Sequence, residues 1–123
     1  MRTAQQFYDM IVSHLRQQNA RSVLDDLYGA NPCAYRGLNN MKCAVGIIIP
    51  DEIYTRSMES KTVSQLIRNN GIGYDIPEEL LLELDQHRKL LSTLQSIHDA
   101  EPVCVWEEHF EILAENLDLQ YTP

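Results

Sequence analysis

The feature that most constrains the fold is a run of apolar residues at helical spacing between residues 80 and 98. They recur at intervals of 4, 3, 4, 3 and 4 residues, as Leu80, Leu84, His87, Leu91, Leu94 and His98. This spacing places them on one face of an α-helix, and a second apolar set widens that face: Leu81, Leu90 and Ile97. Pro77 suits the first position of a helix. We therefore predict one long helix, central to the core, from about residue 77 to 99.

Other segments carry the same periodicity with clear start signals. Capping boxes, in which a Thr and a Gln three residues later satisfy the first free amides of a helix, stand at Thr3 with Gln6 and at Thr62 with Gln65. A last amphipathic stretch follows Glu101-Pro102. The predicted further helices cover 4–18, a short segment after residue 62, and about 103–117.

The least helical stretch runs from Cys33 to Ile49. Two runs that favour β-structure flank Gly37 and the pair Asn39-Asn40, and asparagine tolerates the left-handed conformation of tight turns. We predict a β-hairpin here. The fold class is then α+β and predominantly helical, with one β-hairpin (about 33–49) packed against four or five helices.

Length and composition indicate a single domain over residues 1–123, in which 118–123 form a loose tail. The net charge is −8 and is uneven: the first 50 residues carry five basic and three acidic side chains, and the remaining residues five basic and fifteen acidic. Nucleic-acid backbones are bound by clustered Lys and Arg, so this balance argues against nucleic-acid binding. An acidic surface serves solubility or meets a basic partner.

The sequence predicts a cytoplasmic protein. No apolar stretch follows the single basic residue near the N-terminus, so no secretory signal is expected. The longest apolar run, from Ala44 to Pro50, is far shorter than the ~18 residues that a membrane span needs. Three cysteines make an odd number, which favours reduced thiols over a disulfide framework.

The cysteines allow three interpretations. In the first, Cys33 and Cys43 lie opposite each other on the hairpin and fill space in the core, as free cysteines commonly do. In the second, they join two of Cys104, His98 and His109 in a zinc site, although the sequence has no CxxC or HxxxH pair. The leading prediction is no metal or other cofactor.

The third interpretation is nucleophilic catalysis. Cys43 as nucleophile, His98 as base and Asp99 as the group that orients it supply the necessary residue types, although their spacing does not predict proximity. The leading prediction is that the protein has no catalytic residues and that this set is the alternative.

The tip of the predicted hairpin offers candidate interaction residues. Tyr35, Arg36 and Lys42 combine an aromatic ring with two cations, which can stack on or pair with a partner. A salt bridge from Arg36 to an acidic helix explains the same residues.

The hairpin block resembles a group of small uncharacterised proteins from phages, prophages and bacteria. Their pattern, C-x-Y-R-G followed by K-C-A-x-G-x-x-I-P-D-E-x-Y, is met here by Cys33, Tyr35, Arg36, Gly37, Lys42, Cys43, Ala44, Gly46, Ile49, Pro50, Asp51, Glu52 and Tyr54. The segment Leu94 to Asp99, followed by Trp106, resembles a second block. The resemblance implies a phage-related accessory protein and no particular activity.

The leading functional hypothesis is a small, non-enzymatic protein-interaction or regulatory protein, such as a phage-encoded modulator or inhibitor of a host or defence component. A protein partner is expected, and a homodimer stays open because the long apolar stripe could face a second helix. The alternatives are a hydrolase or transferase that uses Cys43, His98 and Asp99, and a small zinc-stabilised module.

Overall fold

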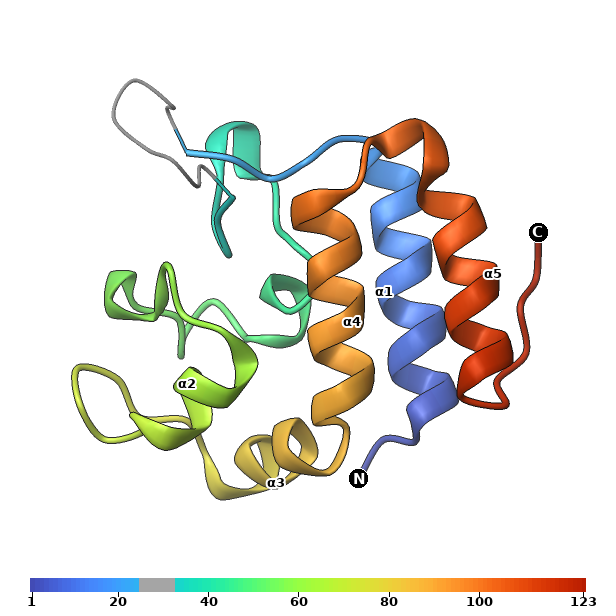
Figure 1. The fold of residues 1–123 in the computed structure, drawn as a ribbon. Helices are drawn as coiled ribbons and strands as arrows, with labels where there is room; N and C mark the ends of the chain where they lie inside the picture. The colour runs from blue at the N-terminus through green and yellow to red at the C-terminus, as the bar shows by residue number, and fades with distance from the viewer. Residues whose placement is uncertain (25–32) are drawn as a thin grey trace.

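The computed structural model describes residues 1–24 and 33–123 and is mainly helical in these ranges. The α-helices are α1 (Ala4–Gln18), α2 (Val63–Arg68), α3 (Glu78–Gln86), α4 (Arg88–Ala100) and α5 (Trp106–Asn116). Short 3-10 turns are η2 (Leu38–Asn40), η3 (Gly46–Ile48), η4 (Arg56–Met58) and η5 (Val103–Val105). Helices α1, α4 and α5 lie side by side, and α2, α3 and the irregular segment before α2 lie on the other side of α4 (Figure 1).

The predicted helix starts at Thr3 and Thr62 are confirmed. In both capping boxes the Thr hydroxyl accepts from the backbone amide of the Gln, and the Gln side chain accepts from the backbone amide of the Thr. The first box leads into α1, whose bounds match the predicted 4–18.

The predicted helix from 77 to 99 is two helices, α3 and α4, that meet at His87. His87 leaves helical geometry with φ −108° and ψ 26°. Its Nε2 lies 3.1 Å from the carbonyl oxygen of Arg2, and its ring packs against Phe7 with 5.2 Å between ring centroids. The break lets α3 pack on α2 while α4 packs on α1 and α5.

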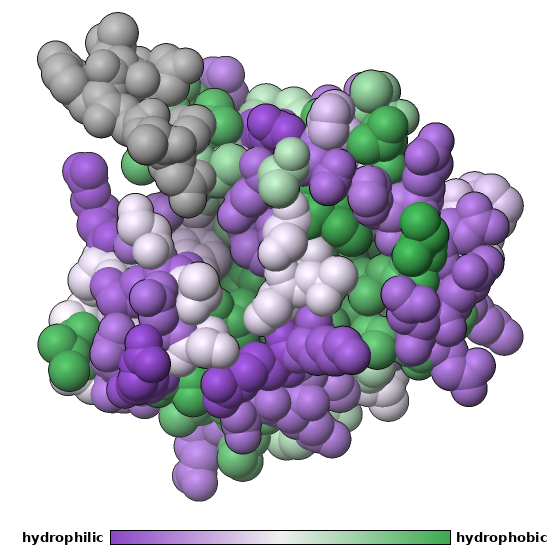
Figure 2. Space-filling model, viewed as in Figure 1, coloured by the Kyte–Doolittle hydropathy of each residue, from purple (hydrophilic) through white to green (hydrophobic). Residues whose placement is uncertain are grey.

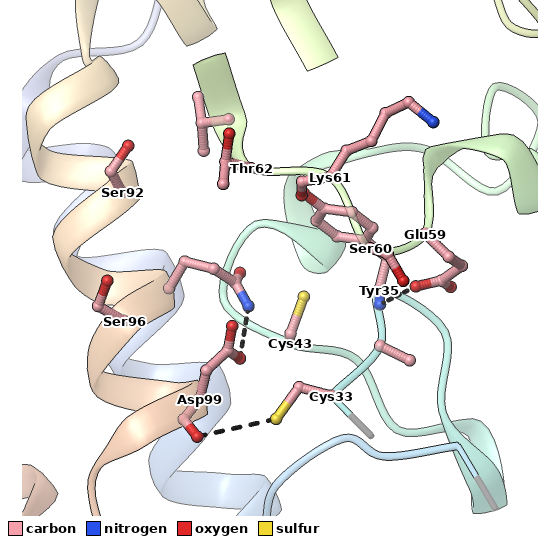
Figure 3. A pocket seen from close by; sticks show the side chains of 13 residues that line it. Cys33, Tyr35, Cys43, Glu59, Ser60, Lys61, Thr62, Ser92, Ser96 and Asp99 are labelled. Atoms are coloured by element: carbon pink, nitrogen blue, oxygen red, sulfur yellow. Dashed lines mark hydrogen bonds between the residues drawn. The ribbon is translucent and has the colours of Figure 1, made fainter. Parts of the chain in front are cut away.

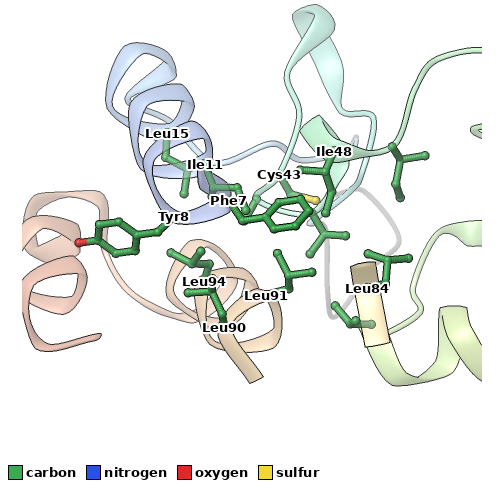
Figure 4. Packing of buried hydrophobic residues seen from close by; sticks show 14 of the residues in the cluster. Phe7, Tyr8, Ile11, Leu15, Cys43, Ile48, Leu84, Leu90, Leu91 and Leu94 are labelled. Carbon is green, nitrogen blue, oxygen red and sulfur yellow. The ribbon is translucent and has the colours of Figure 1, made fainter. Parts of the chain in front are cut away.

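The core forms between α1, α4 and the irregular segment. Figure 4 shows Phe7, Ile11 and Leu15 of α1 facing Leu91 and Leu94 of α4, with Leu84, Cys43 and Ile48 completing the cluster. All of these side chains are buried. The apolar stripe that left a homodimer open is thus covered by the protein's own core.

The predicted β-hairpin over 33–49 is wrong, and with it the α+β class. In the described ranges the only β-pairing is an isolated antiparallel bridge between Val23 and Cys33. The segment expected to hold two strands contains the turns η2 and η3 instead. Asn39 and Asn40 do adopt the left-handed conformation, with φ of 57° and 60°, but within the turn η2 and not between two strands.

Side chains take the backbone groups that a hairpin ladder would use. The Glu59 carboxylate accepts from the amides of Tyr35 and Arg36, at 2.9 and 3.2 Å. The Arg36 guanidinium donates to the carbonyl oxygens of Gly46 and Ile49, at 2.7 and 2.5 Å. Buried backbone polar groups need partners but not a particular kind of partner, so these contacts remove the requirement for strand pairing.

The segment after α5, predicted to be a loose tail, is bonded to α1 and α5. Gln120 exchanges two hydrogen bonds with the side chain of Gln5, and Arg16 donates to the carbonyl oxygen of Thr122 at 2.7 Å. The Tyr121 hydroxyl donates to Glu107 at 2.8 Å. None of the helices in the described part of the chain combines the length and hydropathy needed to cross a bilayer.

Candidate functional site

A buried polar cluster lies at the C-terminal end of α4. His98 is fully buried there and is bonded at both ring nitrogens. Its Nδ1 lies 2.6 Å from Oδ1 of Asp99, and its Nε2 accepts from the backbone amide of Ser22 at 2.9 Å. Since an amide can only donate, the neutral ring carries its proton on Nδ1 and donates it to Asp99. The imidazole thus joins the segment after α1 to the last turn of α4.

Cys33, and not Cys43, completes this cluster. The thiol of Cys33, one ring nitrogen of His98 and one carboxylate oxygen of Asp99 all lie within 4.8 Å of one another. The thiol also donates to the backbone carbonyl of Asp99 at 3.9 Å, as Figure 3 shows. The bridge between Val23 and Cys33 holds this cysteine beside the segment that contains Ser22.

The two cysteines of the first half are both poor nucleophiles in this environment. Burial, followed by the neighbouring charge of Asp99, raises the pKa of Cys33 to about 11. Burial raises the pKa of Cys43 to about 12. A thiolate is the reactive form of cysteine, so both residues are almost wholly unreactive thiols near neutral pH.

The histidine is also unsuited to act as a general base. In a nucleophilic pair, one ring nitrogen must accept the proton of the nucleophile while the other is oriented by a carboxylate. Asp99 does orient Nδ1, but Nε2 already accepts from Ser22 in the dry interior. In the predicted catalytic set of Cys43, His98 and Asp99, the histidine does contact the carboxylate. Neither ring nitrogen is free to accept a proton from a nucleophile.

Cys33, His98 and Asp99 lie close enough to bind a metal ion, and they are the one such cluster of at least three His, Cys, Asp or Glu residues in the described ranges. Structural zinc takes four ligands. Of the other predicted ligands, Cys104 is exposed, Cys43 is outside the cluster, and His109 pairs with Glu101 at 3.3 Å. The zinc set predicted from the sequence is therefore brought together only in part.

The three predicted interaction residues are engaged within the protein. Tyr35 is buried and its hydroxyl donates to the carbonyl oxygen of Lys61. Arg36 packs its guanidinium over the ring of Tyr54, 4.7 Å from its centroid, besides bonding the carbonyls described above. Lys42 pairs with Asp51 at 3.3 Å. These contacts give the three residues a structural role.

Three residues of this region were not predicted as site residues. Ser22 and Glu59 gave no signal for such a role, because each bonds a residue far away in the chain. Gln95 did offer one: it lies four residues before Asp99 on α4, the spacing at which side chains on a helix meet. Its Nε2 donates to Oδ1 of Asp99 at 2.8 Å, and its Oε1 accepts from the amide of Val45 at 2.9 Å.

Comparison of the chain with protein-family models, with curated proteins and with solved structures finds no match.

Proposed function

We propose that this protein acts by binding a basic segment of a protein partner through the exposed face of α5. This surface, called the α5 face below, consists of Glu108, Glu111, Ile112 and Glu115. Their spacing of i, i+3, i+4 and i+7 puts them on one side of the helix. The opposite side is buried through Trp106, Phe110, Leu113 and Ala114.

The observation that carries the proposal is an exposed isoleucine flanked by three glutamates that form no ion pair with the described residues. Ile112 is 51% exposed. None of the three glutamates of the α5 face forms an ion pair with a described residue, whereas their neighbour Glu107 is bound by Arg16. Hydrophilic side chains surround smaller apolar areas over α5, toward the right of Figure 2. A basic amphipathic segment could pair its positive charges with the glutamates of the α5 face and pack its apolar side chains against Ile112.

The chemistry of the cysteines and histidines supports a binding role in preference to the hydrolase or transferase alternative. Cys33 and Cys43 have raised pKa values, and both nitrogens of His98 are bonded. The resemblance of the sequence to phage and prophage proteins would make the partner a host or defence component. A modulator of this kind needs a recognition surface and no catalytic group.

The test compares two variants of equal charge in affinity capture from a host lysate. The first variant, Glu108→Lys with Glu111→Lys, replaces two negative charges of the α5 face with positive ones. The second, Glu52→Lys with Asp75→Lys, makes the same change in net charge at exposed positions elsewhere. We expect proteins captured by the wild type to be lost by the first variant, retained by the second, and released by salt. Equal losses from both variants, or capture that is indifferent to salt, would contradict the proposal.

The exposed isoleucine provides a second measurement that does not alter charge. Ile112→Ser should leave the fold intact because the side chain is half exposed. We expect it to weaken binding of the captured partner about fivefold, since burying the exposed half of an isoleucine is worth on the order of 1 kcal/mol. An unchanged affinity would limit the contact to charges and refute the proposed apolar component.

A zinc-stabilised module is the second candidate. The proximity of Cys33, His98 and Asp99 favours it, but the position of the proton on the His98 ring opposes it. Binding at Nδ1 of His98 would require its proton to move to Nε2, where it would face the amide of Ser22. We therefore expect no thiolate-to-metal absorption band on addition of Co²⁺, and a melting temperature unchanged by a chelator. Appearance of the band, and its loss in Cys33→Ser, would establish the metal site instead.

A further inference from the structure

A cavity of about 180 Å³ opens between α4 and two segments of the irregular region, residues 33–35 and 59–63. Figure 3 shows Ser92, Ser96 and Asp99 of α4 on one side and Cys33, Tyr35 and Thr62 on the other. This volume far exceeds the ~10–15 Å³ that one water needs, and it is below the roughly 300 Å³ at which pockets for drug-sized ligands begin. The cavity suits one side chain or a small metabolite.

The cavity is lined by the carboxylate of Asp99, of which one oxygen is hydrogen-bonded to described residues and the other is not. Oδ1 of Asp99 accepts both from His98 and from Gln95, at 2.6 and 2.8 Å. Oδ2 receives no hydrogen bond from any described residue, and the Asp99 side chain is 30% exposed. Two donors on one oxygen fix the orientation of the group, so the second oxygen is a preorganised acceptor at the edge of the cavity.

No described cation of the lining neutralises this carboxylate. Lys61 lines the cavity, but its ammonium donates to the carbonyl oxygen of Ser57 and lies 6.0 Å from the ring centroid of Tyr74. In Figure 3 its side chain points away from Asp99. Glu59 adds a second negative charge to the wall. The cavity therefore favours a cationic occupant.

The remaining walls fit the stem of such a cation. Ala34, Tyr35, Cys43 and Val63 supply apolar surface, against which methylene groups can pack. The hydroxyls of Ser92 and Ser96 lie on the same side of α4 as Asp99, two turns and one turn before it. They provide further acceptors for a group with several donor hydrogens.

From this geometry we propose that the cavity binds a primary ammonium group carried on an aliphatic stem, with Asp99 as its counter-ion. An ammonium is a compact charge that can use a single carboxylate oxygen. A guanidinium prefers two parallel bonds to both oxygens, and Oδ1 is already occupied by His98 and Gln95. The source is either a lysine side chain or a free alkyl amine. This inference goes beyond the proposed function and does not depend on it.

The experiment is a titration of the isotopically labelled full chain, followed by amide NMR shifts. The probes are Nα-acetyl-lysine methylamide, n-butylammonium, and Nα-acetyl-norleucine methylamide, which has a similar stem without the charge. We expect both amines to shift the resonances of Gln95, Asp99 and residues 59–63, with no effect of the norleucine compound. Tighter binding of the lysine compound would identify the occupant as a lysine side chain of a peptide. Tighter binding of n-butylammonium would identify it as a free alkyl amine. Shifts with norleucine equal to those with lysine would overturn the proposal.

Variants test the role of the carboxylate. Asp99→Asn can still accept from His98 and Gln95 but turns an amide donor toward the ammonium, so we expect affinity to fall about tenfold or more. Ser92→Leu fills the cavity without touching the bonds of Asp99 and should also abolish binding, which keeps the test decisive if Asp99→Asn folds poorly. Glu78→Gln removes an exposed carboxylate of α3 that does not line the cavity and should bind normally. Wild-type affinity in Ser92→Leu, or in folded Asp99→Asn, would refute the inference.

Discussion

Arg36 replaces the strand pairing that the sequence led us to expect, and its substitution by lysine tests this account directly. The guanidinium donates to three carbonyl oxygens, those of Gly46, Ile49 and Tyr35, at 2.7, 2.5 and 3.2 Å. Its side chain is only 17% exposed. Arg36→Lys keeps the charge and the aliphatic stem, but a single ammonium cannot reach acceptors spread across a planar fork.

The expected loss of stability follows from the bonds that lysine cannot make. A hydrogen bond from a charged donor contributes about 1.5–3 kcal/mol, and lysine should retain one of the three. Allowing for partial replacement by water, Arg36→Lys should lower the free energy of unfolding by about 3 kcal/mol. For a chain of this length each kcal/mol corresponds to roughly 4 °C, so the melting temperature should fall by about 12 °C.

The assay is urea denaturation followed by circular dichroism, with Arg56→Lys as the matched control. Arg56 is exposed in the neighbouring turn η4, and its substitution should change stability by less than about 0.5 kcal/mol. The m-value should be the same in all three proteins if the unfolding transition is two-state. A loss below about 1 kcal/mol in Arg36→Lys, or a loss equal to that of the control, would refute the reasoning that Arg36 organises this region.

Three further predictions concern backbone packing, pH and thiol reactivity. A Cβ at Gly46 would lie 2.5 Å from the carbonyl oxygen of Tyr35, so Gly46→Ala should lower the free energy of unfolding by about 3 kcal/mol in the same urea titration. The control is Gly71→Ala, which should cost about 1 kcal/mol of backbone strain because Gly71 has φ +94° and open space around it. Equal losses in the two variants would contradict the close contact at Gly46. Three hydrogen bonds from Arg2 hold the pKa of Glu83 below its ordinary value, so their stabilisation is complete above about pH 4.3 and is lost as the pH falls through the lowered pKa. Glu83→Gln should therefore cost about 1 kcal/mol at pH 7 and less toward pH 3, and a difference that does not change with pH would speak against the ion pair. A chromogenic thiol reagent at pH 8 should modify the exposed Cys104 rapidly but Cys33 and Cys43 only after denaturation. The reason is that burial raises the pKa of Cys33 to about 11 and that of Cys43 to about 12. Rapid modification of a second thiol in the folded protein would restore the catalytic alternative.

Local sequence signals predicted the helices well because those signals act over a few residues. Both capping boxes and the bounds of α1 depend on contacts within one turn of the chain. The break at His87 depends instead on Arg2 and Phe7, some 80 residues earlier. Periodicity continues across the break because both helices turn their apolar residues toward the same core, so the pattern alone could not divide them.

The irregular segment shows the opposite limit, since its composition favoured strands while distant side chains took its hydrogen bonds. Glu59, Arg36 and Gln95 bond backbone groups that lie 10 to 50 residues away, and no propensity scale contains such contacts.

The polar cluster shows why residue types suggested chemistry that the geometry does not support. His98 and Asp99 are adjacent in the sequence and do form the predicted hydrogen bond, but the second partner of the imidazole is a backbone amide. An amide donor at Nε2 changes the role of the ring from base to structural acceptor, and the same bond places the ring proton on Nδ1, where it fixes Asp99. His98 and Gln95 thus both donate to Oδ1 of Asp99, which lines the cavity, and Oδ2 receives no hydrogen bond from a described residue. In this protein the features that remove catalytic potential from His98 are the ones that prepare Asp99 to bind a cation.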